Sequence, residues 1–212
     1  MDTFERLRDE IAPGLRLAHV VREDLLAATE KAGGLTAAVS LRTQEALLAL
    51  AEGGARVVVC TCSTLGAEAE KAAGEAEIPV MRIDRPMADA AVRQARVIGV
   101  CAALAPTLQP TRALIENSAA RAGRNVRVRE FLFDDVWPAF REGRLDDYHA
   151  GIAARLGQAA REVDLLVLAQ ASMAPAARLA GELSVPVLSS PRIGFTEAAR
   201  IAGAVSREKA LL

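Results

Sequence analysis

The sequence predicts an α/β protein built from parallel sheets with helices on their faces, and three observations lead to this fold class. Short runs rich in β-branched residues alternate with longer runs rich in Ala, Leu, Glu and Arg along the whole chain. The chain has 212 residues, 51% of them hydrophobic, so it can bury the core of one large or two small domains. Part of the alternation occurs twice, which indicates two similar lobes.

Each run can be assigned to an element by its period and composition. The β-rich runs predict strands at residues 15–21, 56–61, 80–83, 96–101, 125–130, 165–169 and 186–188. The helix-forming runs predict helices at residues 2–11, 36–52, 65–76, 87–95, 107–122, 146–162, 175–183 and 196–204.

The internal repeat divides the chain. Residues 57–64, followed by a helix and Ile-Pro-Val at 78–80, have a counterpart in residues 166–173, a helix and Val-Pro-Val at 185–187. Aligning Ser63 with Ser172 sets Cys62 against Ala171. We therefore predict a first lobe of residues 1–92 and 196–212, a second lobe of residues 93–195, and two loops that face each other across a cleft.

The repeat also predicts that the first lobe lacks a strand. The second lobe begins with the strong strand at 96–101, whereas the first begins directly at its helix. In a doubly wound sheet the first strand is usually interior, so its absence would expose apolar helix faces. We expect either that the true start lies upstream or that another chain or segment covers the opening.

The pentapeptide Cys60-Thr61-Cys62-Ser63-Thr64 follows a buried strand and precedes a helix, where an α/β sheet places chemistry. A cysteine at a helix N-terminus has a lowered pKa, which makes Cys62 the candidate nucleophile or acid/base. Cys60 lies deeper along the strand, so we expect it in the core. Cys101 ends a strand and is predicted to be structural, although it is the one substitute acid available.

Four hydroxyl residues are predicted at helix starts: Ser63, Thr64, Thr107 and Ser172. Helix capping explains any one of them. As a group they favour the binding of a carboxylate, because helix N-termini offer backbone N–H groups to anions.

Other residues have simpler interpretations. Asp84 is predicted to be a turn or cap residue, and His19 and His149 to be surface or hydrogen-bonded core residues. Aromatic residues gather between positions 131 and 140, where we expect them to cover a lobe edge or a subunit contact in a homodimer.

Composition excludes several classes of function. The net charge of −1 argues against nucleic acid and anionic membrane partners. The apolar run at 97–105 is shorter than the roughly 20 residues of a membrane span, and the start is not a signal peptide, so we expect a cytoplasmic protein. Three cysteines without a Cys-x-x-Cys pair predict neither disulfides nor zinc. The chain has no Gly-rich phosphate loop and no lysine placed for pyridoxal phosphate, so no cofactor and no metal are expected.

Taken in order, several motifs resemble those of the aspartate/glutamate racemase superfamily, over nearly the whole chain. Its enzymes are cofactor-independent and have two pseudo-symmetric α/β lobes, each donating one cysteine after a strand. Cys62-Ser63-Thr64 matches the motif of the first lobe. A loosely annotated branch is matched more closely, through residues 61–63, 83–88, 168–174 and 187–192.

Two departures from the superfamily pattern affect the chemistry. Ala171 or Gln170 stands where the second cysteine is expected, and Ala103 replaces a threonine in the loop after Val100, leaving Thr107. In the full scheme a thiolate removes the proton from the carbon next to a carboxylate, and a thiol on the other face returns one. With one thiol, decarboxylation of a malonate-type acid or cis/trans isomerisation is the alternative.

The resemblance therefore implies an enzyme, an isomerase of the racemase kind, that acts on a small carboxylate or amino acid. Cys62 would be the thiol acid/base or nucleophile, and Ser63, Thr64, Thr107, Ala171 and Ser172 would bind the substrate. Two alternatives stay open: a one-cysteine decarboxylase or isomerase of the same fold, and a degenerate protein that binds small carboxylates without turnover.

Overall fold

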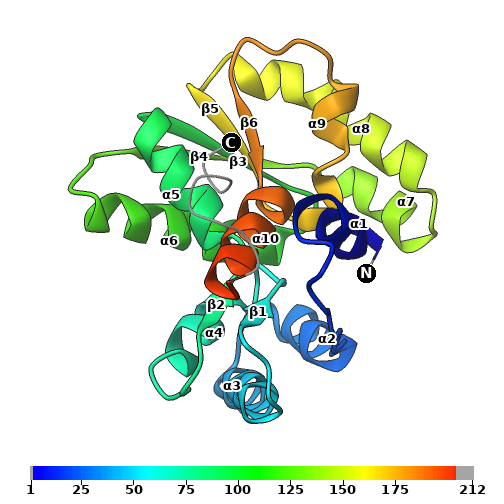
Figure 1. Cartoon of the computed structure of the whole chain (residues 1–212). Coiled ribbons are helices and arrows are strands. Elements are labelled where there is room, and N and C mark those ends of the chain that lie inside the picture. Colours follow the sequence, from blue (N-terminus) through cyan, green and yellow to red (C-terminus); the bar gives the residue numbers. More distant parts are fainter. Residues whose placement is uncertain (1, 204–212) are drawn as a thin grey trace. The chain divides into compact units, whose positions relative to one another are not determined.

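The computed structural model describes residues 2–203 of the chain, which form two compact units (Figure 1). One unit comprises Met1–Asp84 and Pro191–Leu212, and the other comprises Arg85–Ser190. The sequence-based division places residues 85–92 in the first lobe, whereas the helix α5 (Arg85–Gln94) packs on α6, β5 and β6 of the second unit. The last residue of the predicted helix 196–204, and residue 1, lie outside the described residues.

The first unit contains a two-stranded parallel sheet, β1 (Val58–Cys60) and β2 (Val80–Arg82), in which Val58 pairs with Val80 and Cys60 with Arg82. Its helices are α1 (Asp2–Ile11), α2 (Glu23–Ala32), α3 (Ala37–Glu52), α4 (Gly66–Ala72) and α10 (Ser190–Ile201). The sequence did not predict α2, which ends at Gly33 in the left-handed conformation with a φ of 69°.

Apolar clusters hold the described part of the first unit together. Leu25, Val39 and Leu47 pack with the strand residues Val58 and Val80, which joins α2 and α3 to the sheet. A second cluster joins the start of the chain to its end through α1 and α10; it contains Leu7, Ala12, Phe195 and Ala199.

The second unit contains a four-stranded parallel sheet in the order β4-β3-β5-β6. The strands are β3 (Val97–Ala102), β4 (Arg127–Leu132), β5 (Leu165–Leu168) and β6 (Val187–Ser189). Around them lie the α-helices α5, α6 (Ala105–Arg121), α7 (Trp137–Arg141), α8 (Leu145–Ala160) and α9 (Ala176–Leu179), and the short 3₁₀ helices η1 (Asp134–Val136) and η2 (Ala171–Met173). The fold class is the one that the sequence predicts, an α/β arrangement with parallel sheets and flanking helices.

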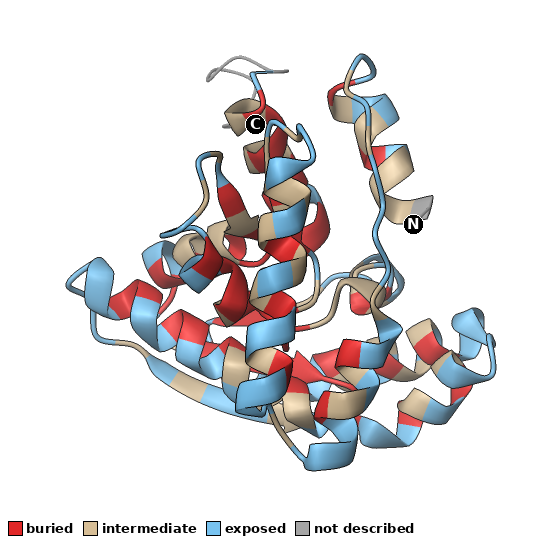
Figure 2. Cartoon of the chain, turned by 90° about the horizontal axis from the view of Figure 1, so that it is seen from below, coloured by how far each residue is buried: buried red, intermediate tan, exposed pale blue. Residues whose placement is uncertain are grey.

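Burial follows the amphipathic pattern of each element. The helices carry buried residues along one side and exposed residues along the other (Figure 2). β5 is buried at every position, as expected of a strand covered on both faces. None of the helices between residues 2 and 203 is long and apolar enough to cross a membrane.

The aromatic residues between positions 131 and 140 pack inside the second unit. Trp137 stacks on Phe140 with ring centroids 4.7 Å apart, and Phe140 lies 5.0 Å from the ring of the fully buried Tyr148. Phe131, Trp137 and Phe140 are partly buried and pack against the core cluster that α8 forms with β5, and the subunit contact stays a prediction.

The predicted strand at 15–21 is wrong. This segment is irregular, and Val20 and Val21 are 56% and 60% exposed. The segment follows α1 in the first unit, just as β4 follows α6 in the second unit. In the second unit, β4 forms because it pairs with β3. Within residues 2–203, β1 pairs with β2 alone, whereas β5 pairs with both β3 and β6. The first unit thus has no described counterpart of β3, so the segment lacks the partner that a strand needs.

Candidate active site

The candidate active site is the turn that connects β1 to α4 in the first unit. It begins at Thr61, which is exposed, and α4 begins at Gly66. Cys62 is partly buried, and Ser63 and Thr64 are buried. The turn is closed by the backbone N–H of Gly66, which donates to the carbonyl oxygen of Ser63 at 3.4 Å.

Burial raises the pKa of the Cys62 thiol above its ordinary value. The backbone N–H groups of Leu65 and Thr64 and the hydroxyl of Thr64 oppose this shift by hydrogen bonding to the sulfur, and the negative charge of Asp84 reinforces it. The prediction of a lowered pKa at the helix start is therefore wrong in sign, because desolvation outweighs the donors. The raised pKa favours the protonated thiol over the thiolate.

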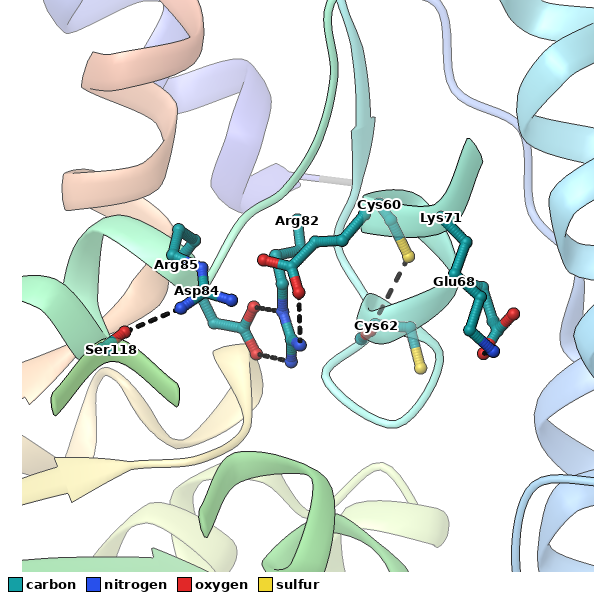
Figure 3. A network of polar contacts seen from close by, with 9 residues as sticks. Cys60, Cys62, Glu68, Lys71, Arg82, Asp84, Arg85 and Ser118 are labelled. Atoms are coloured by element: carbon teal, nitrogen blue, oxygen red, sulfur yellow. Dashed lines mark hydrogen bonds and ion pairs between the residues drawn. The ribbon is translucent and has the colours of Figure 1, made fainter. Parts of the chain in front are cut away.

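Cys60 supports the turn from the end of β1. Its thiol is buried and donates to the carbonyl oxygen of Cys62 at 3.7 Å (Figure 3). Burial raises the pKa of Cys60 to about 12. Its predicted core position is confirmed.

A buried ion pair beside the turn was missed by the sequence analysis. Nε of Arg82 donates to Oδ1 of Asp84 at 2.6 Å, and Nη2 donates to Oδ2 at 3.0 Å (Figure 3). Arg82 is 3% exposed and Asp84 is 1% exposed, so Asp84 is more than a turn residue. Nη1 of Arg82 also lies 3.7 Å from a carboxylate oxygen of Glu70. The signal in the sequence was the spacing of two, which directs both side chains to one face at the end of a strand.

A second buried carboxylate, Glu68, was also missed. It accepts hydrogen bonds from Ser40 and from Gln44, the latter at 2.6 Å, and pairs with Nζ of Lys71 at 2.9 Å. Burial raises the pKa of Glu68, but hydrogen bonds from Lys71, Ser40 and Gln44 outweigh it, and the net pKa is lowered. This cluster ties α4 to α3.

The other predicted binding residues lie in the second unit. Thr107 is 2% exposed and is the third residue of α6. Ala171 begins η2, and the hydroxyl of Ser172 lies 3.0 Å from that of Tyr148. Nε2 of His149 hydrogen-bonds to the carbonyl oxygen of Ser172 at 2.9 Å, so the lone histidine is hydrogen-bonded, as predicted.

None of the four hydroxyl residues is the N-cap residue of the helix that follows it. The N-cap residues of α4, α6 and α9 are Leu65, Leu104 and Pro175, and none of them makes a side-chain cap hydrogen bond. The predicted positions at helix starts were one to three residues off, because α6 begins before Thr107 and η2 precedes α9. Of these four residues, Ser63 and Thr64 lie in the same turn as Cys62.

Hydrogen bonds at equivalent points give the correspondence between the two units. The N–H of Val58 donates to the carbonyl of Pro79, and the N–H of Leu166 to that of Pro186, both at 2.9 Å. Val58 and Leu166 are therefore equivalent, and they are 108 residues apart. The same offset makes Gln170 the equivalent of Cys62.

The loops that follow the strands obey the same offset. The N–H of Gly66 donates to the carbonyl of Ser63, and the N–H of Ala174 donates to that of Ala171. The alignment of Cys62 with Ala171 is therefore wrong by one residue, and Ser63 corresponds to Ala171.

Gln170 is held in place by the neighbouring loop. Its side-chain carbonyl accepts a hydrogen bond from the backbone N–H of Ala103 at 2.7 Å, which ties the loop after β5 to the loop after β3. Cys101, the candidate substitute acid, is fully buried in β3, and burial raises its pKa to about 12. The second unit thus offers a carboxamide where the first offers a thiol.

The structure brings Cys62, Ser63 and Thr64 together in one turn of the first unit, and Thr107, Ala171 and Ser172 belong to the second. Among the described residues, there is no group of three or more His, Cys, Asp or Glu side chains that could hold a metal ion.

Comparison with solved structures shows the same fold in several racemases. An aspartate racemase homologue from Pyrococcus horikoshii has a TM-score of 0.68 and 15% identity, with 95% of this chain and 91% of that chain covered. A putative Asp/Glu racemase from Yersinia pestis has a TM-score of 0.64 and 16% identity, with 95% and 92% covered.

The glutamate racemase isoform RacE1 from Bacillus anthracis has a TM-score of 0.58 and 21% identity, and the match covers 77% of this chain but 65% of that one. This chain thus spans less than two thirds of the length of RacE1. No curated protein matches by sequence. The sequence profile of the Asp/Glu/Hydantoin racemase family matches residues 4–198. The chain belongs to the Asp/Glu/hydantoin racemase family.

Proposed function

We propose that this chain is a cofactor-independent enzyme that acts on a small carboxylate and uses Cys62 as its one catalytic thiol. Cys62 gives a proton to one face of the carbon next to the carboxylate. The reaction class that requires this step alone is the decarboxylation of a malonate-type acid. We propose this one-thiol chemistry ahead of a two-thiol racemisation.

The observation that carries the proposal is the carboxamide of Gln170 at the position equivalent to Cys62. A carboxamide donates and accepts hydrogen bonds but does not exchange a proton near neutral pH. The loops after β3 and β5, at 103–104 and 169–174, contain no ionisable side chain. A racemase of the two-thiol kind needs an acid on each face of the substrate, so this sequence favours protonation from one face.

The raised pKa of Cys62 supports the role of an acid. In the proposed step the bond between carbon α and one carboxylate breaks, carbon dioxide leaves, and the electron pair stays on carbon α as an enediolate. The Cys62 S–H bond then breaks, carbon α takes the proton, and the thiolate is protonated again by water. A thiol that is protonated at neutral pH is ready for this step, whereas proton abstraction would first require a thiolate.

The buried turn supplies the rest of the proposed site. The hydroxyls of Ser63 and Thr64, beside Cys62, are suited to stabilising the carboxylate and the enediolate. The substrate contacts predicted for Thr107, Ala171 and Ser172 stay predictions, as do the cytoplasmic location and the homodimer.

The test is carbon dioxide release from a panel of 2,2-disubstituted malonates, compared between the wild type, Cys62→Ala and Cys62→Ser. We expect both Cys62 variants to lose at least about a hundredfold in rate, the usual worth of a positioned general acid. Cys60→Ala is the matched control, since it removes a thiol two positions away, and should keep most of the activity.

A second measurement separates the alternatives. Single enantiomers of amino acids are incubated in deuterated water, and α-deuterium incorporation and inversion are both followed. Inversion that depends on Cys62 would overturn the one-face mechanism in favour of racemisation. No turnover of any acid, together with protection of Cys62 from alkylation by dicarboxylates, would leave the non-catalytic binding protein as the function.

A further inference from the structure

We propose that Arg82 and Asp84 are positioning residues for Cys62: the buried pair supports the first turn of α4 and sets the charge that the thiol faces. The inference rests on the proposed function for its consequence in catalysis. Its physical content, the ionisation and reactivity of Cys62, is measurable without any substrate. Neither residue is expected to touch the substrate.

The geometry begins at Gly66, the first residue of α4. A Cβ atom at this position would lie 2.8 Å from both Nε and Nη2 of Arg82 and 2.9 Å from Cζ. The guanidinium is thus packed directly against the backbone of the turn that carries Cys62. The two hydrogen bonds that Arg82 donates to Asp84 fix the plane of the guanidinium, because they use the fork of the arginine and both carboxylate oxygens.

The second step concerns charge. Asp84 raises the pKa of Cys62 through its negative charge, and Asp84 and Arg82 act in opposite directions on Cys60. Of the other charged groups on α4, Glu70 lies against Arg82, and Glu68 pairs with Lys71. Asp84 therefore acts on Cys62 through its charge, Cys60 contacts the Cys62 backbone, and Arg82 compensates the charge of Asp84.

Stability alone is a weak reason for such a pair. A buried ion pair contributes little net stability, because desolvation of the two ions offsets their attraction. Here the pair lies at the end of β2, beside the end of β1 and under the turn, with its two members 3% and 1% exposed. A charge pair at this position affects an adjacent thiol in a way that two apolar side chains would not.

The experiment measures the pH dependence of iodoacetamide alkylation at Cys62, with the modified cysteine identified by peptide mass spectrometry. Asp84→Asn removes the negative charge and should lower the pKa of Cys62, whereas Arg82→Met leaves Asp84 uncompensated and should raise it. At pH 8 we expect the alkylation rate to change about three- to tenfold in opposite directions, as for a unit charge at short range. The double variant should lie between the two.

Opposite signs distinguish positioning of charge from loss of structure, since both single variants destabilise the fold. Glu197→Gln is the control, because it removes one negative charge from the same unit on α10. Its alkylation profile should match the wild type. A shift of both single variants in the same direction, or no shift in either, would overturn the proposal.

A further variant changes no charge and covers the case in which the Arg82 or Asp84 variants do not fold. Gly66→Ala forces the guanidinium away from the turn and should slow alkylation of Cys62 at pH 8, as Arg82→Met does. Gly74→Ala is the matched control, since its Cβ would meet only the Lys71 carbonyl oxygen at 3.4 Å. An unchanged alkylation profile in a folded Gly66→Ala protein would count against the proposal.

The outcomes for this inference and for the proposed function are separable. If no malonate or amino acid is turned over, the alkylation profiles still test whether the pair controls Cys62. If turnover requires Cys62 but the profiles do not move, the positioning role fails and the enzyme assignment stands.

Discussion

At the scale of one residue, Gln170 occupies the position in the second unit that is equivalent to Cys62 in the first. Its carbonyl oxygen is used by the backbone of Ala103. A carboxamide in this position can make hydrogen bonds but does not exchange a proton near neutral pH.

The first prediction at this scale separates the structural part of Gln170 from the rest. Gln170→Ala leaves the Ala103 N–H without its acceptor and should lower the unfolding free energy by about 1–2 kcal/mol. Gln170→Glu keeps an acceptor oxygen and should cost less. Chemical denaturation of both variants measures the difference, and equal losses would show that the hydrogen bond to Ala103 contributes nothing.

Sequence reasoning singled out Cys62 but not the buried groups near it. The strand and helix patterns on either side of residue 62 are local, so the position of the thiol was predictable. The sign of its pKa shift was not, because it depends on how deeply the turn is buried and on Asp84. In the same way, the spacing of Arg82 and Asp84 was visible, but their burial was not.

At the scale of elements, α10 lies against the end of β2 with no space between the backbones. A Cβ atom on Gly194 would lie 2.0 Å from the carbonyl oxygen of Ile83, closer than any real contact. Only glycine allows this approach. The contact lies one residue from Asp84, so the packing of α10 against Ile83 also affects the position of Asp84.

The prediction for this element compares two helical glycines. Gly194→Ala should lower the unfolding free energy by about 1–3 kcal/mol, the usual cost of overpacking, or more if the backbone cannot shift. Gly157→Ala, in α8, meets nothing within 4 Å and should stabilise by up to about 1 kcal/mol through helix propensity. Thermal unfolding of both variants tests this, and a neutral Gly194→Ala would contradict the close packing.

Helices and strands with a clear hydrophobic pattern in the sequence were predicted well. Elements that form only when a neighbouring strand is present were not. The helices α1 and α3 and the strand β5 lie within one residue of their predicted bounds. The segment 15–21 has the composition of a strand, yet pairing decides whether a strand forms, and no described strand lies ready to pair with it. The short helix α7 was not predicted, because Trp137–Arg141 contains two aromatic residues and a proline, which do not form a typical helix pattern.

At the scale of the whole molecule, three buried acids limit stability at high pH. Burial raises the pKa of Cys60 and of Cys101 to about 12, and that of Tyr148 also to about 12. The corresponding unfolded groups titrate near 8.5 for cysteine and 10 for tyrosine. A folded pKa above the unfolded one means that the stabilisation is complete below the unfolded pKa and is lost as the pH rises toward the folded pKa.

The expected result is a loss of unfolding free energy that begins at about pH 8.5 with the two cysteines, steepens above about pH 10 when Tyr148 adds to it, and continues to about pH 12, each titrating group contributing about 1.4 kcal/mol per pH unit. Cys101→Ala should flatten this slope by one group in the second unit, although it also lowers stability at pH 7. Denaturation curves at several alkaline pH values measure both slopes. Identical slopes in the wild type and Cys101→Ala would show that Cys101 ionises equally in both states.

The two-unit organisation was predictable from the internal repeat, whereas its boundaries were not. The repeat is visible in the strands and loops only. The helix α5 belongs to the second unit because it packs on β5 and β6, which the repeat does not show. The correspondence of Cys62 with Gln170 could likewise be established only from the backbone hydrogen bonds. The sequence alignment matched the identical residues Ser63 and Ser172, which placed it one residue off.

The difference between the two sheets has a consequence for local opening. Within residues 2–203, β1 shares its ladder with β2 alone, while β5 is held on both sides. Proteins open in cooperative parts, and the part with fewer buried ladder bonds opens at lower free energy. Cys62 follows the strand with one partner, so amide protons around Cys62 should exchange with solvent through partial opening of the first unit rather than through global unfolding.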